Sequence, residues 1–275
     1  MRLLFAMLAA AVVAAATVAG AAEQVEIPHG EATLPGILYR PEGPGPFPGV
    51  IALHGCSGLM SRAGTIHRGL ADWGDRLAAA AGVAVLFLDS FSTRGLTAQC
   101  SMRVLKVRPA RERVADANAA LRWMQEQSWA QKDRISLMGW SEGAMASLWA
   151  VRRRGARRDE VPDFRSAIAF YPGCRGLGAR AWAARVPTLI LIGRADDLTP
   201  AAACEQMVAD ARGRTAHTAI VVYPGAYHFF DRPNFPVRVV TGILRSADGS
   251  GNAHFGTDDA ARADALKRVP EWLTR

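Results

Sequence analysis

The stretch Ile135-Ser-Leu-Met-Gly-Trp-Ser-Glu-Gly143 decides the fold. Its first four residues predict a short buried strand, and residues 142–154 have a helical pattern that ends at Gly155. Between the strand and the helix, residues 139–143 match the pattern G-x-S-x-G. In this context the pattern is typical of a sharp turn that lifts a serine hydroxyl out of the backbone, with glycines that avoid steric conflict. Ser141 is therefore predicted to be a nucleophile, and the alternative is a serine that only caps the helix.

Apolar runs typical of strands alternate with helical periodicity on both sides of this stretch. This alternation predicts an α/β fold with a mainly parallel, doubly wound sheet that is flanked by helices. Because no linker or repeat interrupts the alternation, residues 23–275 are expected to form a single domain. Further strands are expected at 33–40, 50–53, 83–88, 166–170, 189–192 and 219–222, and further helices around 70–81 with Gly82 after the last turn, from Pro109 onward, over 201–212 and over 258–273.

The composition fits a chain with a large apolar core, since 50% of the residues are hydrophobic and 21% are charged. That balance excludes an extensively disordered chain. The 33 Lys and Arg residues against 25 Asp and Glu residues give a net charge of +8, but the basic residues are scattered. Because the sequence has no basic stripe with interleaved aromatic residues, no nucleic-acid partner is expected.

The N-terminus predicts export. Arg2 precedes an apolar run, and small residues stand before Glu23, which is typical of a signal peptide over Met1–Ala22. The alternative is an uncleaved membrane anchor, for which the alanine-rich run is borderline in length. We therefore expect a periplasmic or secreted protein with no stable membrane anchor after cleavage.

The chain has four cysteines, Cys56, Cys100, Cys174 and Cys204, and none of them forms a CxxC pair. Their spacings do not resemble a zinc site. An even number of cysteines behind an export signal favours disulfides, and the residues alone leave all three pairings open.

A serine nucleophile needs a base and an acid that orients the base, and in this type of fold they follow in the order Asp or Glu, then His. Asp196 and Asp197 stand just past one predicted strand, and only one of two adjacent side chains is expected to reach the base. His228 stands just past the next strand and is the preferred base, because sites in α/β sheets lie at the carboxyl ends of the strands. His254 is the weaker rival, and His217 lies at the wrong end of the sheet.

An oxyanion needs backbone N–H donors. One donor is expected from Glu142, the residue after the nucleophile. The other is expected from the loop His54-Gly-Cys-Ser-Gly58, in which we favour the amide of Cys56. His54 is expected to shape this loop rather than to act as a base.

Four side chains near strand ends or the serine turn are expected to approach the substrate pocket: Phe91, Arg94, Trp140 and Tyr171. Arg94 either binds a substrate carboxylate or stabilises its own loop. Residues 229–256 are a long stretch without clear periodicity, and such stretches are often functional, so we expect this one to form a wall of the site.

Five motifs stand in a fixed order along the chain: Leu53-His-Gly-Cys-Ser-Gly58, Leu88-Asp-Ser-Phe-Ser-Thr-Arg-Gly95, Gly139-Trp-Ser-Glu-Gly143, Gly193-Arg-Ala-Asp196 with Pro200, and Tyr223-Pro-Gly-Ala-Tyr-His228. In this order they resemble the dienelactone hydrolase family of the α/β-hydrolase superfamily, over roughly residues 30–275. The resemblance implies a hydrolase of small-molecule esters or lactones that works through an acyl-enzyme and needs no metal or organic cofactor.

The founding members of that family have a cysteine nucleophile where this chain has Ser141, and an acidic residue where it has His54-Gly55. These differences favour a general serine esterase on the same scaffold. Two alternatives stay open, an exported peptidase or amidase with the same triad, and a binding protein that kept the fold without activity.

The family pattern implies that Asp196 is the acid of the triad, because it stands three residues after Gly193 and four before Pro200. Asp197 is then expected to be solvated or to cap the helix that begins near Pro200.

The strand order of the superfamily also implies a disulfide pairing. Cys56 and Cys100 follow one pair of neighbouring strands, and Cys174 and Cys204 follow another. Since a disulfide needs Cα atoms within about 7 Å, the resemblance implies the bonds Cys56–Cys100 and Cys174–Cys204.

Overall fold

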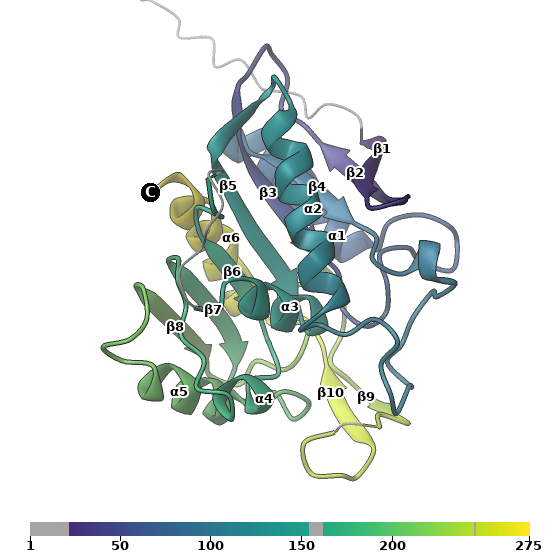
Figure 1. Ribbon diagram of the computed structural model, residues 1–275. Helices are drawn as coiled ribbons and strands as arrows, with labels where there is room; N and C mark the ends of the chain where they lie inside the picture. Colours follow the sequence, from purple (N-terminus) through teal and green to yellow (C-terminus); the bar gives the residue numbers. More distant parts are fainter. Residues whose placement is uncertain (1–21, 154–161, 245) are drawn as a thin grey trace, which may run out of the picture.

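The computed structural model describes residues 22–153, 162–244 and 246–275, and it has a central eight-stranded sheet (Figure 1). The strands of this sheet are β1 (Glu23–His29), β2 (Ala32–Tyr39), β3 (Phe47–Leu53), β4 (Ala84–Leu88), β5 (Ala130–Trp140), β6 (Ala167–Phe170), β7 (Thr188–Gly193) and β8 (Thr218–Tyr223). They lie in the order β1-β2-β4-β3-β5-β6-β7-β8. The pairs β1–β2 and β2–β4 are antiparallel, and the other neighbours are parallel, so the predicted, mainly parallel sheet is confirmed.

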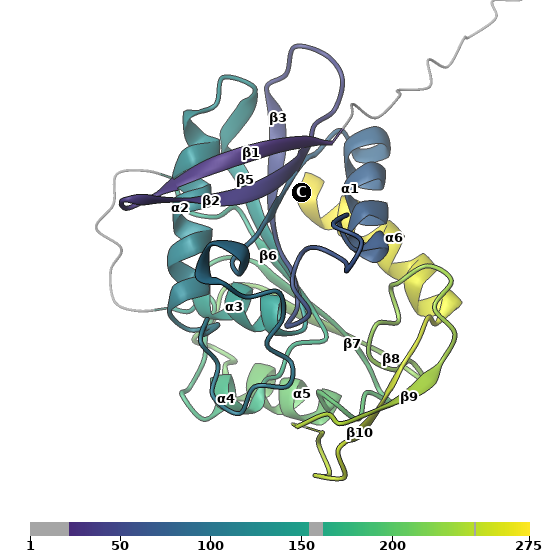
Figure 2. The same cartoon turned by 90° about the vertical axis from the view of Figure 1, so that its right-hand side faces the viewer.

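Helices cover both faces of the sheet (Figure 2). They are α1 (Arg68–Ala81), α2 (Glu112–Glu126), α3 (Glu142–Ala150), α4 (Arg175–Gly178), α5 (Ala201–Asp210) and α6 (Asp259–Thr274), with one 3₁₀ turn, η1 (Ser92–Arg94). In Figure 2, α1 and α6 lie on one side of the sheet and α2 and α3 lie on the other. The chain is therefore doubly wound, as its alternating pattern predicts.

The buried strands pack on both faces. In β3, Val50 and Ala52 belong to the apolar cluster that includes α1, whereas Ile51 and Leu53 belong to the cluster that includes α2. Because successive residues of a strand point to opposite faces, a strand covered on both sides has an unbroken apolar sequence. The short apolar runs of the sequence are therefore a reliable signal for this part of the sheet.

Two pieces of strand structure were not expected from the sequence. One is β1, and the other is a separate hairpin of β9 (Arg238–Thr241) and β10 (Asn252–Phe255), inside the stretch expected to be irregular. Ile27 is the one fully buried residue of β1, and β9 has no fully buried residue. With so few buried positions, any apolar alternation in these strands is too short to identify them in a sequence.

Two helix ends also differ from the prediction. α2 begins at Glu112 rather than at Pro109, and the Glu112 side chain accepts hydrogen bonds from the backbone N–H of Arg108 at 2.8 Å and from its guanidinium group. α3 ends at Ala150, because Arg152 leaves the helix to form a bridge with Ala184. In both places tertiary or side-chain partners replace the helical hydrogen bonds that propensity favours.

Both disulfides have the implied pairing. Cys56 is bonded to Cys100 and Cys174 to Cys204, with Cα–Cα distances of 4.9 and 5.0 Å. The first joins the loop after β3 to the segment after η1, and the second joins the start of α4 to α5.

The predicted signal peptide lies outside the described residues except for Ala22. In the part of the chain that the structure covers, no helix is both long enough and apolar enough to cross a bilayer.

Candidate active site

The predicted sharp turn joins β5 to α3. Ser141 stands at its tip with φ 54° and ψ −115°, a conformation that non-glycine residues rarely adopt. A Cβ atom on Gly143 would lie 2.0 Å from the carbonyl oxygen of Leu53, and one on Gly139 would lie 2.4 Å from the backbone of Gly143. Both flanking residues must therefore be glycine for the turn to close against the end of β3.

The structure brings Ser141, His228 and Asp196 together in one hydrogen-bonded chain. The Ser141 Oγ lies 3.1 Å from the Nε2 of His228, and the Nδ1 of His228 lies 2.7 Å from the Oδ2 of Asp196. The three residues follow β5, β8 and β7 at the carboxyl end of the sheet. His228 and Asp196 are buried, whereas Ser141 is half-buried, so the hydroxyl is the member of the chain that a solute can reach.

Hydrogen bonds from its own loop hold the Asp196 carboxylate. Its Oδ1 accepts from the backbone N–H of Leu198 at 3.0 Å and of Thr199 at 2.8 Å. The Thr199 hydroxyl lies 2.8 Å from Oδ2, the oxygen that faces His228, and 3.2 Å from the Nδ1 of that imidazole. The loop therefore aims one carboxylate oxygen at His228 and keeps the other on backbone donors.

Asp197 has a different partner. Its carboxylate accepts from the backbone N–H of His254 at 2.8 Å and lies 2.7 Å from the Nδ1 of that ring. The expectation that Asp197 caps the following helix is wrong, because α5 has Pro200 at its N-cap and no side-chain cap. The two adjacent aspartates thus point to two histidines, Asp196 to His228 and Asp197 to His254, the weaker rival as base.

The loop after β3 lies against the serine turn. A Cβ atom on Gly55 would lie 3.6 Å from the Cβ of Ser141 and 3.4 Å from the carbonyl oxygen of Trp140. Cys56, whose amide we favoured as an oxyanion donor, is the next residue of this loop, and Glu142, the other expected donor, is the first residue of α3. Glu142 therefore follows Ser141 directly, and Cys56 follows the glycine that lies against Ser141.

His54 shapes this loop. The side chain is fully buried, its Nδ1 donates to the carbonyl oxygen of Gly55 at 2.7 Å, and its Nε2 accepts from the backbone N–H of Ser90 at 3.3 Å. Burial, and then the positive charge of Arg113, lowers the pKa of His54 well below its usual value. A neutral imidazole with both nitrogens bonded to the backbone agrees with a structural role.

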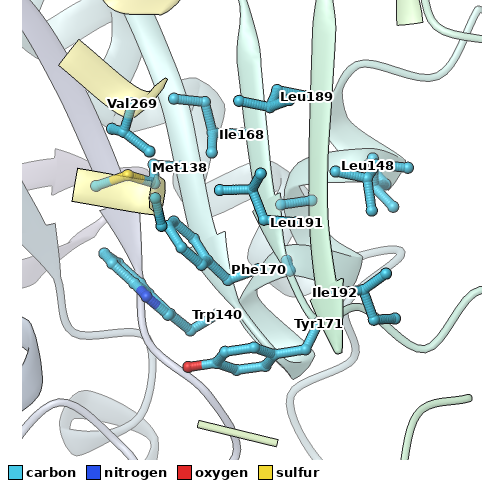
Figure 3. Packing of buried hydrophobic residues seen from close by; sticks show 14 of the residues in the cluster. Met138, Trp140, Leu148, Ile168, Phe170, Tyr171, Leu189, Leu191, Ile192 and Val269 are labelled. Carbon is cyan, nitrogen blue, oxygen red and sulfur yellow. The ribbon is translucent and has the colours of Figure 1, made fainter. Parts of the chain in front are cut away.

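A small pocket opens beside Ser141. Trp140 and Tyr171 line it, as expected, and the side chain of Tyr171 packs on His228 with ring centroids 4.3 Å apart. Figure 3 shows both aromatic side chains at the ends of their strands, next to Phe170. The full lining is Gly55, Ser57, Gly58, His67, Gly69, Leu70, Trp140, Tyr171, Phe229, Asp231 and Arg232.

Phe91 and Arg94, which were also expected near the substrate, are not among the residues that line this pocket. Phe91 is 1% exposed and packs in a small separate cluster with Leu96 and Val107. The Arg94 guanidinium donates to both carboxylate oxygens of Asp116, at 2.8 and 2.7 Å, and to the carbonyl oxygen of Ser90 at 2.6 Å. Its donors are used within the protein, so the alternative that Arg94 stabilises its own loop agrees with the structure.

Asp231 is a pocket residue that the sequence did not reveal. Its buried carboxylate accepts from the indole N–H groups of Trp73 and Trp140, each at 2.8 Å, and from the hydroxyl of Tyr171 at 2.7 Å. Burial, and then the negative charge of Asp231, raises the pKa of Tyr171 well above its usual value, so the hydroxyl stays a donor. Asp231 thus fixes the two aromatic walls that stand next to Ser141 and His228.

Arg232 is a second pocket residue that the sequence did not reveal, and it adds a cation to the lining that also holds the Asp231 carboxylate. Its guanidinium carbon lies 3.4 Å from the ring centroid of Phe229, another lining residue. Burial, and then the charge of Arg232, lowers the pKa of His67, which also lines the pocket. Two sequence signals bear on Asp231 and Arg232: they follow the candidate base His228 within four residues, and they lie in the stretch 229–256 that is expected to form a wall of the site.

The stretch 229–256 does form a wall of the site. Phe229, Asp231 and Arg232 line the pocket, and the end of the β9–β10 hairpin is tied to the candidate base, since Gly256 donates its N–H to the carbonyl oxygen of His228 at 2.9 Å. Within the described ranges, no group of three or more His, Cys, Asp or Glu residues is arranged to hold a metal ion.

Comparison with known proteins gives the family. The sequence profile of the dienelactone hydrolase family matches residues 34–275. No curated protein has a significant sequence match to the chain.

Solved structures share its fold. A protein assigned as a dienelactone hydrolase from Klebsiella pneumoniae subsp. pneumoniae MGH 78578 matches with a TM-score of 0.68 and 20% identity, over 93% of this chain and 98% of that chain. Esterase 2 of Thermogutta terrifontis matches with a TM-score of 0.62 and 19% identity, over 92% of this chain and 94% of that chain. The acylaminoacyl peptidase of Pyrococcus horikoshii matches with a TM-score of 0.63 and 15% identity, over 92% of this chain but 41% of that chain. With this sheet order and a profile match over most of its length, the chain belongs to the dienelactone hydrolase family and has the α/β-hydrolase fold.

Proposed function

We propose that this hydrolase is a serine esterase that cleaves small carboxylic esters or lactones through an acyl-enzyme on Ser141. The observation that carries the proposal is the hydrogen-bonded chain from the Ser141 hydroxyl through His228 to Asp196. That order of groups activates a weak nucleophile, because the imidazole accepts the hydroxyl proton and the carboxylate orients and stabilises the imidazolium that results.

The reaction follows from this geometry. The Oγ of Ser141 attacks the ester carbonyl carbon while its proton moves to the Nε2 of His228, and the carbonyl oxygen becomes an oxyanion. The backbone N–H groups of Cys56 and Glu142 stabilise that oxyanion. The tetrahedral intermediate collapses, the C–O bond to the alcohol breaks, and His228 returns the proton to the departing oxygen. A water molecule, deprotonated by the same imidazole, then hydrolyses the acyl-enzyme and restores Ser141.

The pocket supports a compact substrate. There is little free space between its walls, which include the apolar and aromatic side chains of Leu70, Trp140, Tyr171 and Phe229. Arg232 adds a positive charge at the wall. Such a pocket suits a small acyl group, and the cation favours a substrate that carries negative charge or develops it.

The N-terminal sequence and the disulfides support export. Two disulfides form and persist in an oxidising compartment, and the sequence of Met1–Ala22 is typical of a signal peptide. We therefore propose a periplasmic or secreted enzyme in which residues 23–275 form one α/β-hydrolase domain.

The experiment that tests the function compares esters with amides. The purified chain with both disulfides is assayed on 4-nitrophenyl acetate and butyrate and on the matching anilides, and it is labelled with a fluorophosphonate. Turnover of the esters together with labelling that depends on Ser141 supports the esterase. Faster turnover of the anilides supports the peptidase or amidase alternative. A chain that shows neither turnover nor labelling is a binding protein, and the proposed function then fails.

A further inference from the structure

Gln99 connects the two loops that flank Ser141. Its backbone N–H donates to the carbonyl oxygen of Cys56 at 2.8 Å, and its side-chain Nε2 donates to the Oε1 of Glu142 at 2.5 Å. Gln99 is fully buried. Within the described residues, its side chain has no hydrogen bond to Ser141 or His228. One residue thus binds both residues whose amides we assign to the oxyanion.

The segment that carries Gln99 is itself fixed. The side chain donates to the carbonyl oxygen of Val107 at 2.7 Å and accepts from the N–H of Val107 at 3.2 Å. The next residue, Cys100, is bonded to Cys56. A Cβ atom on Gly58 would lie 2.2 Å from the carbonyl oxygen of Thr97, so the two loops are in direct backbone contact. Gln99 is therefore a rigid support rather than a mobile side chain.

A buried charge lies behind the same carboxylate. Arg113 is fully buried, and its Nη1 lies 3.7 Å from the Oε1 of Glu142. The three guanidinium nitrogens of Arg113 have no hydrogen-bond partner within the described part of the chain. The cation compensates the charge of Glu142 but does not fix its direction, because a directed bond needs a hydrogen bond. Gln99 thus supplies a directed hydrogen bond to the Glu142 side chain.

We propose that Gln99 is a positioning residue that holds the amides of Cys56 and Glu142 at the spacing an oxyanion requires. The inference rests on the proposed serine esterase function. Oxyanion donors act only when they are preorganised at hydrogen-bonding distance from the developing charge, and a displacement of about 1 Å by a distant change can cost about a hundredfold in rate. Loss of the Gln99 side chain removes the hydrogen bond to Glu142 at the first residue of α3, and it removes the two bonds to Val107 that fix the segment beside Cys56.

The test uses Gln99→Met, which keeps the side-chain length and the backbone hydrogen bond to Cys56 but removes the donor to Glu142. Its matched control is Gln125→Met. Gln125 is also a buried glutamine whose Nε2 donates to two main-chain carbonyls, those of Lys132 and Pro162, but on α2 and away from the site. Each variant is assayed on 4-nitrophenyl butyrate and on the corresponding thionoester. Sulfur is a weaker hydrogen-bond acceptor than oxygen, so the ratio of kcat/KM between the two substrates reports on the oxyanion donors.

We expect Gln99→Met to lower kcat on the oxygen ester by about 10–100-fold with KM within about twofold, and to lower the ester-to-thionoester ratio by at least about fivefold. Gln125→Met should keep both the kcat and the ratio within about twofold, at whatever cost in thermal stability. An unchanged ratio in Gln99→Met, or an equal change in Gln125→Met, overturns the inference while leaving the esterase intact. Wild-type protein without ester turnover instead removes the proposed function itself.

A second variant covers the case in which Gln99→Met does not fold. Gln99→Glu keeps the acceptor for the Val107 N–H but replaces the donor to Glu142 by a second carboxylate, and the same fall in the substrate ratio is expected. If neither variant folds with both disulfides, Gln99 has a purely structural role and the inference is overturned.

Discussion

The Ser141 hydroxyl is the one half-buried member of a hydrogen-bonded chain whose other members, His228 and Asp196, are buried. If the three act as a unit, removal of any one of them removes the function of the others. Ser141→Ala and His228→Ala should each lower kcat by about 10⁴–10⁶-fold, and the double variant should be little worse than either. Steady-state kinetics on one ester, with circular dichroism to show an intact fold, checks this. Near-normal turnover in either single variant, after contamination by wild type is excluded, contradicts the assignment.

The adjacent aspartates give a matched pair of variants. Asp196→Asn deprives His228 of its carboxylate and favours the wrong tautomer, so we expect turnover to fall by up to about 10⁴-fold. Asp197→Asn breaks the pair with His254, in which both side chains are 39% exposed. Exposed ion pairs contribute at most about 1 kcal/mol to stability. Because Asp197 faces His254 rather than His228, turnover of this variant should stay within a few-fold of wild type.

Both aspartate variants are measured on the same ester and in the same buffer. A crippled Asp197 variant beside an active Asp196 variant would move the acid by one residue, to the side chain that faces His254.

At the scale of single residues, the sequence predicts those residues of the candidate site whose position depends on local spacing in the chain. Ser141 stands in a five-residue pattern, and Asp196 and His228 follow strand ends, so all three are visible without a structure. Asp231 is not visible in this way, because its three donors come from α1, from the end of β5 and from just after β6. Arg94 shows the reverse case, since a conspicuous arginine near a strand end has a partner, Asp116, that is 22 positions away in the sequence.

At the scale of the elements, the loop after β3 depends on the charge state of His54. Burial, and then Arg113, lowers the pKa of this imidazole well below its usual value. In the unfolded chain the pKa is about 6.5, so below that pH the unfolded chain binds a proton that the folded protein does not. The free energy of unfolding therefore falls as the pH falls, by about 1 kcal/mol between pH 7 and pH 5.5 for this group, and is flat above pH 7.

Denaturant unfolding of wild type and of His54→Asn across pH 5–8 checks this expectation. His67, whose pKa is also lowered, is present in both proteins, so the difference in slope reports on His54 together with its electrostatic interaction with His67. The asparagine variant should be less stable at every pH but should lose less stability in acid. Equal slopes would show that His54 titrates alike in the folded and unfolded chains.

The elements themselves were predictable where burial is complete. The central strands are apolar on both faces, and Gly82 ends α1 in the left-handed conformation with φ 63° as its place after a helical face suggests. The predictions of helix ends and strands fail where partners that are distant in the sequence determine the structure. Ala184 takes Arg152 out of α3, and β9 and β10 satisfy each other's backbone with few buried side chains. No local pattern encodes such partners.

At the scale of the whole molecule, alternation of strand and helix was sufficient for the class of fold. The sheet order follows from the family rather than from any residue pattern, since many strand orders are compatible with the same alternation. The pairing of the four cysteines depends on that order, which is why the residues alone leave three pairings open and the superfamily topology selects one.

The two disulfides hold different parts of the carboxyl end of the sheet, so their removal should have different consequences. Cys174–Cys204 joins α4 to α5, and neither of its cysteines lines the pocket, whereas Cys56–Cys100 holds the loop that lies against Ser141. Replacing both members of either bond by serine should lower the free energy of unfolding by about 2–4 kcal/mol, because each bond restricts the unfolded chain.

The Cys174→Ser, Cys204→Ser protein should keep its kcat within about twofold when assayed well below its Tm. The Cys56→Ser, Cys100→Ser protein should lose about tenfold in kcat as well, since the Cys56 amide is then positioned by hydrogen bonds alone. Calorimetry and ester turnover on the two double variants decide the matter. Equal kcat values in both would mean that the covalent bond beside Ser141 contributes stability and nothing to the oxyanion site.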